Sequence, residues 1–178
     1  MLTDGAHVST SIPPKPALPR MPKSYRLPPD VATDQSAWAR VTDMLAGARN
    51  YWVCTVRPDG RPHAMPVWGL WLGEVFYFAT DRASRKGRNL RVNPWMNVHL
   101  ESGDDVVILE GRAEELTDPL ALDLVAEAYE SKYKWRLDPS APGQVTYTLR
   151  PHAAFTWQEK DFPNSATRWL FEETAEDS

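Results

Sequence analysis

A short, strongly basic segment at residues 80–88 carries side chains that can hold a phosphate. It reads TDRASRKGR, so four basic side chains and two hydroxyls fall within nine residues. Ser84 is a good N-terminal cap, and the free amides and dipole of a helix start attract anions. Arg85 can grip a phosphate with two parallel hydrogen bonds, and Lys86 adds a mobile charge. The spacing predicts a phosphate site, although a solvated basic helix with a serine cap fits it equally well.

The elements around this segment are predicted mostly as short strands joined by tight turns. Strands at 51–57, 61–71 and 75–79, connected by turns at 58–60 and 72–74, form an antiparallel meander. Further strands are expected at 95–101, 106–115, 144–149, 153–157 and 168–171. Helices are expected from Thr33 or Asp34 to about Ala48, from Ser84 to just before Pro94, and from the Asp118-Pro119 cap to about Tyr133.

This order of elements predicts a mainly β fold, an antiparallel barrel with a few attached helices, because strands and helices do not alternate. Many of the sixteen prolines precede residue 30. Proline lacks the amide donor of a helix interior, so residues 1–30 are expected to be an extended arm or a disordered tail. The arm either projects into solvent or lies across a partner subunit. Residues 31–178 are expected to form one domain.

Composition excludes several classes of function. A net charge of -4 and a pI near 5.6 argue against a nucleic-acid binder. Cys54 is the only cysteine, which rules out an intrachain disulfide and fits a reducing cytoplasm. The histidines His7, His63, His99 and His152 have no metal-ligand spacing, so no metal site is expected. No apolar run is long enough to span a bilayer, and no membrane association is expected.

The basic segment and the strand before it resemble the cofactor-binding segment of the pyridoxamine 5'-phosphate oxidase-like split-barrel proteins. In that family a strand ends in Thr, a four-residue step leads to Ser-Arg-Lys, and a short helix ends in Asn-Pro. The matching positions in FYFATDRASRKGRNLRVNP are Thr80, Ser84, Arg85, Lys86, Asn93 and Pro94. The sequences FTW at 155–157 and SATRW at 165–169 are similar to the last strands of the flavin/deazaflavin oxidoreductase branch.

The resemblance implies a homodimeric split β-barrel of the FMN-binding-protein type, with a cofactor held by several strands. Residues implied around the phosphate are Ala79, Thr80, Ser84, Arg85, Lys86 and Arg88. Residues implied around the ring are Met65, Pro66, Val67 and Trp68, together with Trp157 and Arg168, which in that branch often come from the partner subunit. A second interpretation makes Trp157 a core or interface aromatic, the commoner place for tryptophan. Arg82 and Arg88 either meet an acidic cofactor tail or face water.

One departure from the family directs the prediction of function. The vitamin B6 oxidase itself has basic residues on the second strand, whereas this chain has the apolar run Met65 to Trp68. The resemblance therefore implies an oxidoreductase that uses coenzyme F420 to transfer a hydride to a small organic substrate. The alternatives are an FMN-dependent oxidoreductase, a non-catalytic flavin or deazaflavin binder, and an interaction protein with an empty pocket. The sequence identifies neither a catalytic proton donor nor the substrate.

Overall fold

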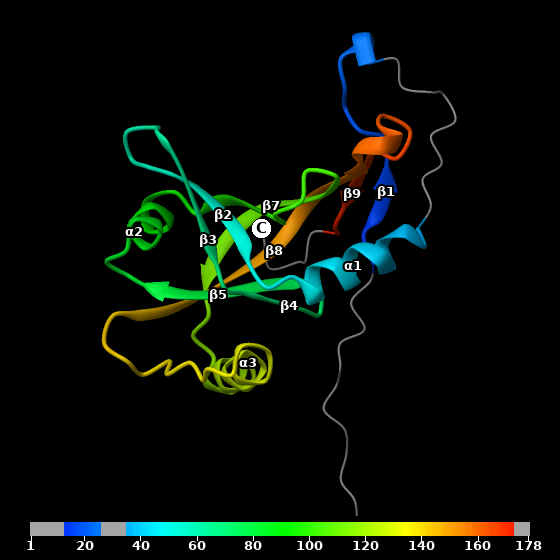
Figure 1. Ribbon diagram of the computed structural model, residues 1–178. Coiled ribbons are helices and arrows are strands. Elements are labelled where there is room, and N and C mark those ends of the chain that lie inside the picture. The colour runs from blue at the N-terminus through cyan, green and yellow to red at the C-terminus, as the bar shows by residue number, and fades with distance from the viewer. Residues whose placement is uncertain (1–12, 26–34, 173–178) are drawn as a thin grey trace, which may run out of the picture.

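The computed structural model describes residues 13–25 and 35–172, and within them nine antiparallel strands form one strongly bent sheet (Figure 1). The strands are β1 (Lys15–Ala17), β2 (Tyr51–Val56), β3 (Pro62–Val67), β4 (Leu70–Leu72), β5 (Val75–Asp81), β6 (Trp95–His99), β7 (Asp105–Glu115), β8 (Gln144–Gln158) and β9 (Thr167–Leu170). Their order is β1-β9-β8-β7-β6-β2-β3, with β5 paired to β8 and β4 paired to β5. This arrangement confirms the predicted antiparallel split barrel.

Strand β8 connects the two parts of the sheet. The first half of β8 pairs with β5, and the second half pairs with β9. On its other edge, β8 pairs with β7 along most of its length. The sequence predicts two strands here, at 144–149 and 153–157, and Pro151 lies in the gap between them. The structure has one strand, because the register shifts at Glu110 and Gly111 of β7 and leaves one extra residue in β8. Such a bulge lets a strand carry a proline and bend.

The second and third helices begin at the caps that the sequence predicts, and the first is observed from Ala37, after Ser36, whose side chain makes no capping hydrogen bond. Helix α1 (Ala37–Gly47) buries Trp38, Val41 and Leu45, the face expected from their spacing. Helix α2 (Arg85–Val92) is capped by Ser84. Helix α3 (Pro119–Tyr133) is capped by Asp118, whose carboxylate accepts from the amides of Leu120 and Ala121. The caps expected for α1 at Thr33 or Asp34 lie outside the described residues.

The predicted strand at 61–71 is divided by Trp68 and Gly69 into β3 and β4. Gly69 explains the break: a Cβ there would lie 2.5 Å from the Phe76 ring, and its amide donates to Tyr133 Oη at 2.9 Å. The chain therefore leaves the β2 ladder at this corner and passes under α3. Among the described strands, β3 pairs with β2 alone and is an edge strand, as its prolines Pro62 and Pro66 require.

The main core lies between α1 and the inner face of the sheet, and a smaller apolar cluster lies under α3. At one end of the sheet α2 covers the β2–β3 hairpin, and at the opposite end β1 pairs with β9 (Figure 1). Part of the Pro-rich segment thus forms a strand with the chain's own β9, while much of the predicted arm lies outside the described residues. No helix of the described ranges is both long and apolar enough to cross a membrane.

Glu74 supplies a stability prediction. Burial raises the pKa of its carboxyl group, and the hydrogen bond from Trp38 Nε1 (3.0 Å) partly opposes this shift. The protonated form is therefore favoured by folding, and the stability it contributes is present at low pH and is lost as the pH rises through the raised pKa. We expect Glu74→Gln to melt at a higher temperature than the wild type at pH 7. The difference should shrink towards pH 4, where both side chains are neutral.

Thermal unfolding between pH 4 and pH 8 tests this expectation. Glu101→Gln, at an exposed position, is the control and should show no comparable gain. A Glu74→Gln variant that melts below the wild type at pH 7 would contradict the prediction.

Candidate cofactor site

Ser84 begins α2 and links it to the end of β5. Its Oγ accepts a hydrogen bond from Gly87 N (3.1 Å) and lies 3.1 Å from Thr80 Oγ1. Ser84 is therefore the helix cap that the sequence predicts. Gly87 lets the first turn approach the preceding loop closely, because a Cβ there would lie 2.7 Å from Asp81 O. Two hydroxyl groups and the start of a helix thus lie together.

Lys86 and Arg85 lie near the hairpin that joins β2 and β3. Burial lowers the pKa of the half-buried Lys86 ammonium. Burial also lowers the pKa of His63 on β3, and three positive charges lower it further. Those charges belong to Arg57, Lys86 and Arg85. We call Arg57, His63, Arg85 and Lys86 the basic cluster.

Arg57 is the member of the basic cluster that no motif in the sequence identifies. Its Nε is buried and has no hydrogen-bond partner within the described residues. Asp59, in the same turn, is instead bonded to Arg61, with its Oδ2 2.6 Å from Arg61 Nη2. A buried donor without a partner costs free energy, so this group favours an acceptor supplied by a ligand.

Asn89 holds α2 against the hairpin. Its side chain is fully buried, and Nδ2 donates to Thr55 Oγ1 at 2.9 Å. Thr55 Oγ1 also lies 3.4 Å from His63 Nδ1. A chain of polar contacts therefore connects α2, β2 and β3 and sets the separation of the groups in the basic cluster.

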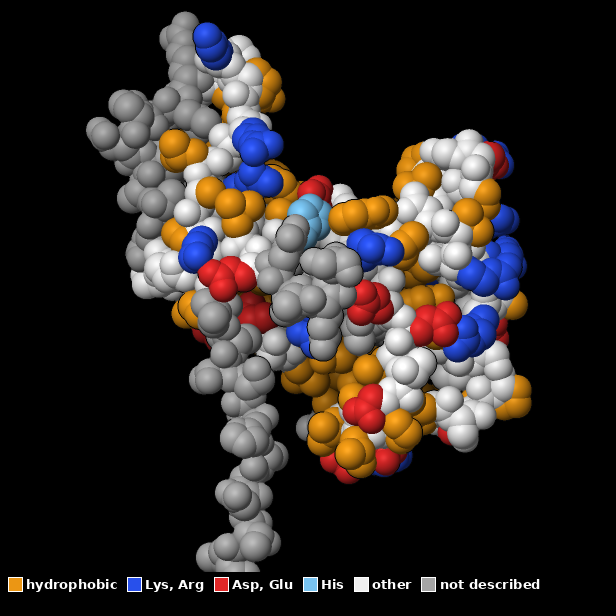
Figure 2. Space-filling model, turned by 180° about the vertical axis from the view of Figure 1, so that it is seen from behind, with side chains coloured by type: hydrophobic (Ala, Val, Ile, Leu, Met, Phe, Trp, Pro, Cys, Tyr) orange, Lys and Arg blue, Asp and Glu red, His pale blue; other side chains and the backbone are white. Residues whose placement is uncertain are grey.

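The donors in the basic cluster fit a phosphate ester. None of the ion pairs among residues 13–25 and 35–172 includes Arg57, Arg85 or Lys86. The Asp59 carboxylate attracts Arg57 and Arg85 only through longer-range Coulombic interactions. Guanidinium and ammonium groups that form no ion pair, beside a helix start, are groups that bind phosphate in proteins. Figure 2 shows Lys and Arg side chains gathered at the end of the molecule that carries α2.

Two other arginines of the segment have partners within the chain. Arg82 forms an ion pair with Glu115 at 2.6 Å, and Arg88 Nη1 donates to Ala83 O. Contact of either side chain with an acidic tail therefore competes with an existing interaction. The cofactor contact predicted for Arg88 stays a prediction.

The residues expected around the ring lie on the edge strand β3 and just beyond it. Met65 is 45% exposed and Pro66 is exposed, whereas Val67 packs partly against the core. His63 and Val67 are separated by about 13 Å, because a strand rises about 3.3 Å per residue. A phosphate held by the basic cluster would therefore leave a chain and ring to extend along β3. Ala79, paired with Thr146, lies on β5 directly before Thr80.

Trp157 and Arg168 lie far from the basic cluster within one chain. Trp157 is near the end of β8, where its ring packs edge-on against Phe162. Arg168 is on β9, opposite Phe155 of β8. Strand β9 and helix α2 are at opposite ends of the sheet (Figure 1). One chain therefore does not bring these two predicted residues to the others.

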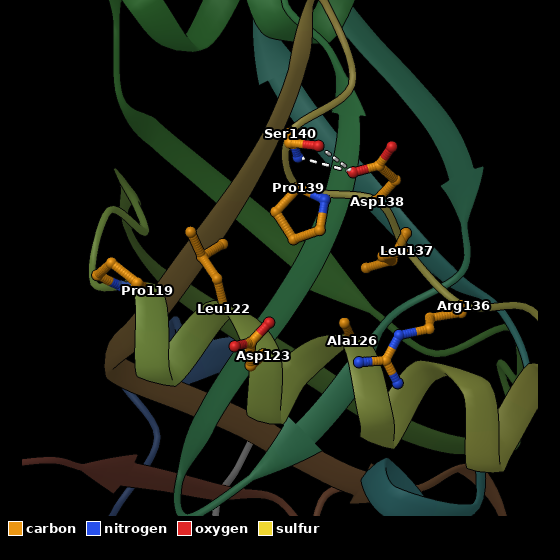
Figure 3. A pocket seen from close by; sticks show the side chains of 9 residues that line it. All are labelled: Pro119, Leu122, Asp123, Ala126, Arg136, Leu137, Asp138, Pro139 and Ser140. Atoms are coloured by element: carbon orange, nitrogen blue, oxygen red, sulfur yellow. Dashed lines mark hydrogen bonds between the residues drawn. The ribbon is translucent and has the colours of Figure 1, made fainter.

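One cavity in the described part of the chain is separate from all of these residues. It has a volume of about 530 Å³ and lies between α3 and the loop at 136–140 (Figure 3). Asp138 accepts hydrogen bonds from the amide and hydroxyl of Ser140 in this loop. A second cavity, of about 270 Å³, lies between α1 and the ends of β7, β8 and β9, and Trp157 lines it.

The bent antiparallel sheet and the basic cluster beside α2 together define a split-barrel protein of the flavin-binding type. The sequence model of the family described as pyridoxamine 5'-phosphate oxidase matches residues 37–158, which is more than half of the chain. The chain therefore belongs to this family, whose members bind flavins such as FMN.

Solved structures give the same result for the fold. General stress protein 26 from Bacillus anthracis is 27% identical, with a TM-score of 0.56 over 66% of this chain and 91% of that one. A conserved hypothetical protein from Mycobacterium tuberculosis is 25% identical, with a TM-score of 0.59 over 74% and 89%. An F420 reductase is 27% identical, with a TM-score of 0.53 over 63% and 93%. A comparison with curated protein sequences gave no match.

Proposed function

We propose that this protein is an oxidoreductase that binds coenzyme F420 through the basic cluster and acts on a small organic substrate. The observation that carries the proposal is the unpaired set of Arg57, Arg85 and Lys86 beside Thr80 and the Ser84 cap. These groups would hold the phosphate. When bound, the deazaflavin supplies the hydride-transfer chemistry. The similarity to an F420 reductase supports this choice of cofactor.

The chain's own residues would bind and orient the ring and exclude water from it. Met65 and Pro66 are exposed apolar residues of β3, and the partly buried Val67 continues the strand, so a flat ring can lie along it. The prolines of β3 have no amide hydrogen, so the free edge of this strand offers few donors. His63 is the only basic side chain of β3, unlike the basic second strand of the vitamin B6 oxidase. This difference favours a deazaflavin reductase over pyridoxamine phosphate oxidation.

We also propose that the protein works as a homodimer located in the cytoplasm. Val56, Met65 and Trp95 are each more than a third exposed on β2, β3 and β6, and exposed apolar side chains of this size favour association. We propose that, in a dimer that covers these strands, the second copy's Trp157 and Arg168 approach the basic cluster. A shared site of this kind would account for the separation of these two groups of residues within one chain.

Titration of the purified protein with F420 and with FMN, followed by calorimetry, tests the proposal. We expect F420 to bind more tightly, and the double variant Arg85→Ala, Lys86→Ala to lose most of that affinity. The matched control, Lys134→Ala with Arg136→Ala, removes the same charge near α3 and should bind normally. Tighter binding of FMN would indicate an FMN-dependent oxidoreductase. If neither F420 nor FMN binds, both the F420-dependent and the FMN-dependent proposals are refuted. Turnover of a bound cofactor with an electron acceptor distinguishes an enzyme from a carrier.

A further inference from the structure

Trp68, the residue after β3, is an exposed aromatic side chain that the rest of the chain holds rigidly. Its indole is 39% exposed, yet it stacks on Tyr133 of α3 with centroids 4.6 Å apart and planes 5° apart. Tyr129 Oη donates to Trp68 O at 2.6 Å. A tryptophan that is held in one position with part of its indole exposed offers a preformed flat surface to a ligand.

The neighbouring Gly69 is fixed by the same helix. Its amide donates to Tyr133 Oη (2.9 Å), and its carbonyl accepts from Lys132 Nζ (3.2 Å). Lys132 Nζ also donates to Tyr51 Oη at 2.9 Å, which ties α3 to β2. The corner between β3 and β4 is therefore clamped from two sides. Because these groups are already ordered, binding of a ligand at this corner would cost little conformational entropy of the protein.

Arg49 adds a positive charge beside this aromatic pair. Its guanidinium carbon lies 5.6 Å from the centroid of Trp68 and 6.0 Å from that of Tyr133. Because these distances are nearly equal and the rings are stacked, the guanidinium lies beside the pair and does not cover the outer face of Trp68. The side chain is exposed, and no carboxylate pairs with it among the described residues.

From this geometry we infer that Trp68 and Arg49 form a subsite for a planar anion, in particular an aromatic or conjugated carboxylate. The ring of such a molecule would stack on the free face of Trp68, and its carboxylate would pair with Arg49. The inference deepens the proposed function and rests on it for one point, that the subsite receives the substrate. Its position fits this role, because Trp68 follows directly after the strand proposed to hold the cofactor ring.

The subsite differs from the basic cluster in the ligand that it selects. The basic cluster offers several donors and, apart from the small His63 imidazole, no aromatic surface, which fits a phosphate. Arg49 and Trp68 offer one fork-shaped cation and one flat apolar face, which fits a carboxylate on a ring. A neutral ring would lose the ion pair, and an aliphatic acid would lose the stacking. Selection between these classes is therefore measurable without knowledge of the natural substrate.

Calorimetry on the full chain with 2-naphthoate, 2-naphthamide and cyclohexanecarboxylate tests the inference. We expect 2-naphthoate to bind at least about ten-fold more tightly than either of the others, since hydrogen bonds to charged groups and stacking each contribute. Arg49→Ala should reduce naphthoate affinity about ten-fold without changing that of the amide, and Arg49→Lys should lose less. Trp68→Leu should reduce the affinities for both 2-naphthoate and 2-naphthamide. The affinities of Trp68→Phe should lie between those of the wild type and Trp68→Leu.

Controls separate this inference from the proposed function. Arg136→Ala, at another exposed arginine, should bind naphthoate normally. F420 titration of Arg49→Ala should be unchanged. If F420 binds but naphthoate does not, or if Arg49→Ala binds naphthoate like the wild type, the subsite is refuted while the proposed function stands. If naphthoate binds as expected but no cofactor does, the proposed function fails alone. A Trp68→Leu protein that changes oligomeric state would assign Trp68 to an interface and overturn the inference.

Discussion

Replacement of Arg57 by alanine is expected to weaken the binding of a phosphate-bearing flavin or deazaflavin about 10- to 100-fold, because hydrogen bonds to charged groups are worth about 1.5–3 kcal/mol each. The positive charge of Arg57, with those of Lys86 and Arg85, lowers the pKa of His63. The Nε of Arg57 is buried without a hydrogen-bond partner in the described part of the chain. A bound phosphate would satisfy that donor. Removal of the Arg57 side chain should therefore reduce the affinity for the cofactor more than removal of a solvated arginine would.

The comparison of FMN with riboflavin makes this prediction specific. Riboflavin lacks the phosphate, so its affinity should be the same for the wild type and Arg57→Ala. Arg61→Ala is the matched control, because Arg61 lies in the same hairpin but is exposed and paired with Asp59. The difference between FMN and riboflavin should also shrink with added salt. An equal loss of both ligands in Arg57→Ala would mean that the variant damages the hairpin and that Arg57 does not contact phosphate.

Local signals in the sequence predict α2 and α3 well. Ser84 caps α2, and Pro94 follows it closely, so both ends of the helix are marked within ten residues. The Asp118-Pro119 pair fixes the start of α3. A cap or a helix-starting proline acts on its own turn, so it can be recognised without knowledge of the rest of the fold. The general pattern of short strands identifies the antiparallel class for the same reason.

Contacts between distant segments could not be predicted in this way. Arg57 and Lys86 both lie near His63 because β2 and β3 pair in one particular register and Asn89 holds α2 against β2. Trp68 meets Tyr133 across sixty-five residues. Neither arrangement can be predicted from the spacing of residues within one segment of the sequence. The sequence does not predict the continuity of β8 through Pro151, because the bulge that permits it depends on the register with β7.

Trp157 and Arg168 show a further limit, since their predicted role depends on a second chain. Resemblance placed them with the cofactor, and the fold puts them at the end of the sheet opposite α2. Their positions are consistent with a site that two subunits share. The same positions would also arise if both residues had only structural roles. A test must therefore distinguish a contribution from the partner subunit from a contribution within the chain.

Mixing two variants that are each deficient in cofactor binding provides that test, and we expect the mixture to recover part of the binding. The first variant, Arg85→Ala with Lys86→Ala, lacks the phosphate contacts but keeps Arg168. The second, Arg168→Ala, keeps the basic cluster but lacks the contact proposed to come from the partner. In a mixed dimer of twofold symmetry, one site combines both defects and the other combines both intact halves. Equal amounts mixed at random would give half mixed dimers, so about a quarter of all sites should recover.

The recovery must appear only after subunits exchange. Each variant is therefore unfolded and refolded together with the other, and separately as a control, before titration with F420. Separate refolding followed by mixing on ice should give no recovery within the time of the titration. If Arg168 acted on the cofactor within its own chain, the mixed dimer would contain no intact site and binding would stay at the level of the single variants. Recovery near a quarter would therefore require both the dimer and the contact across its interface, because neither alone produces an intact site.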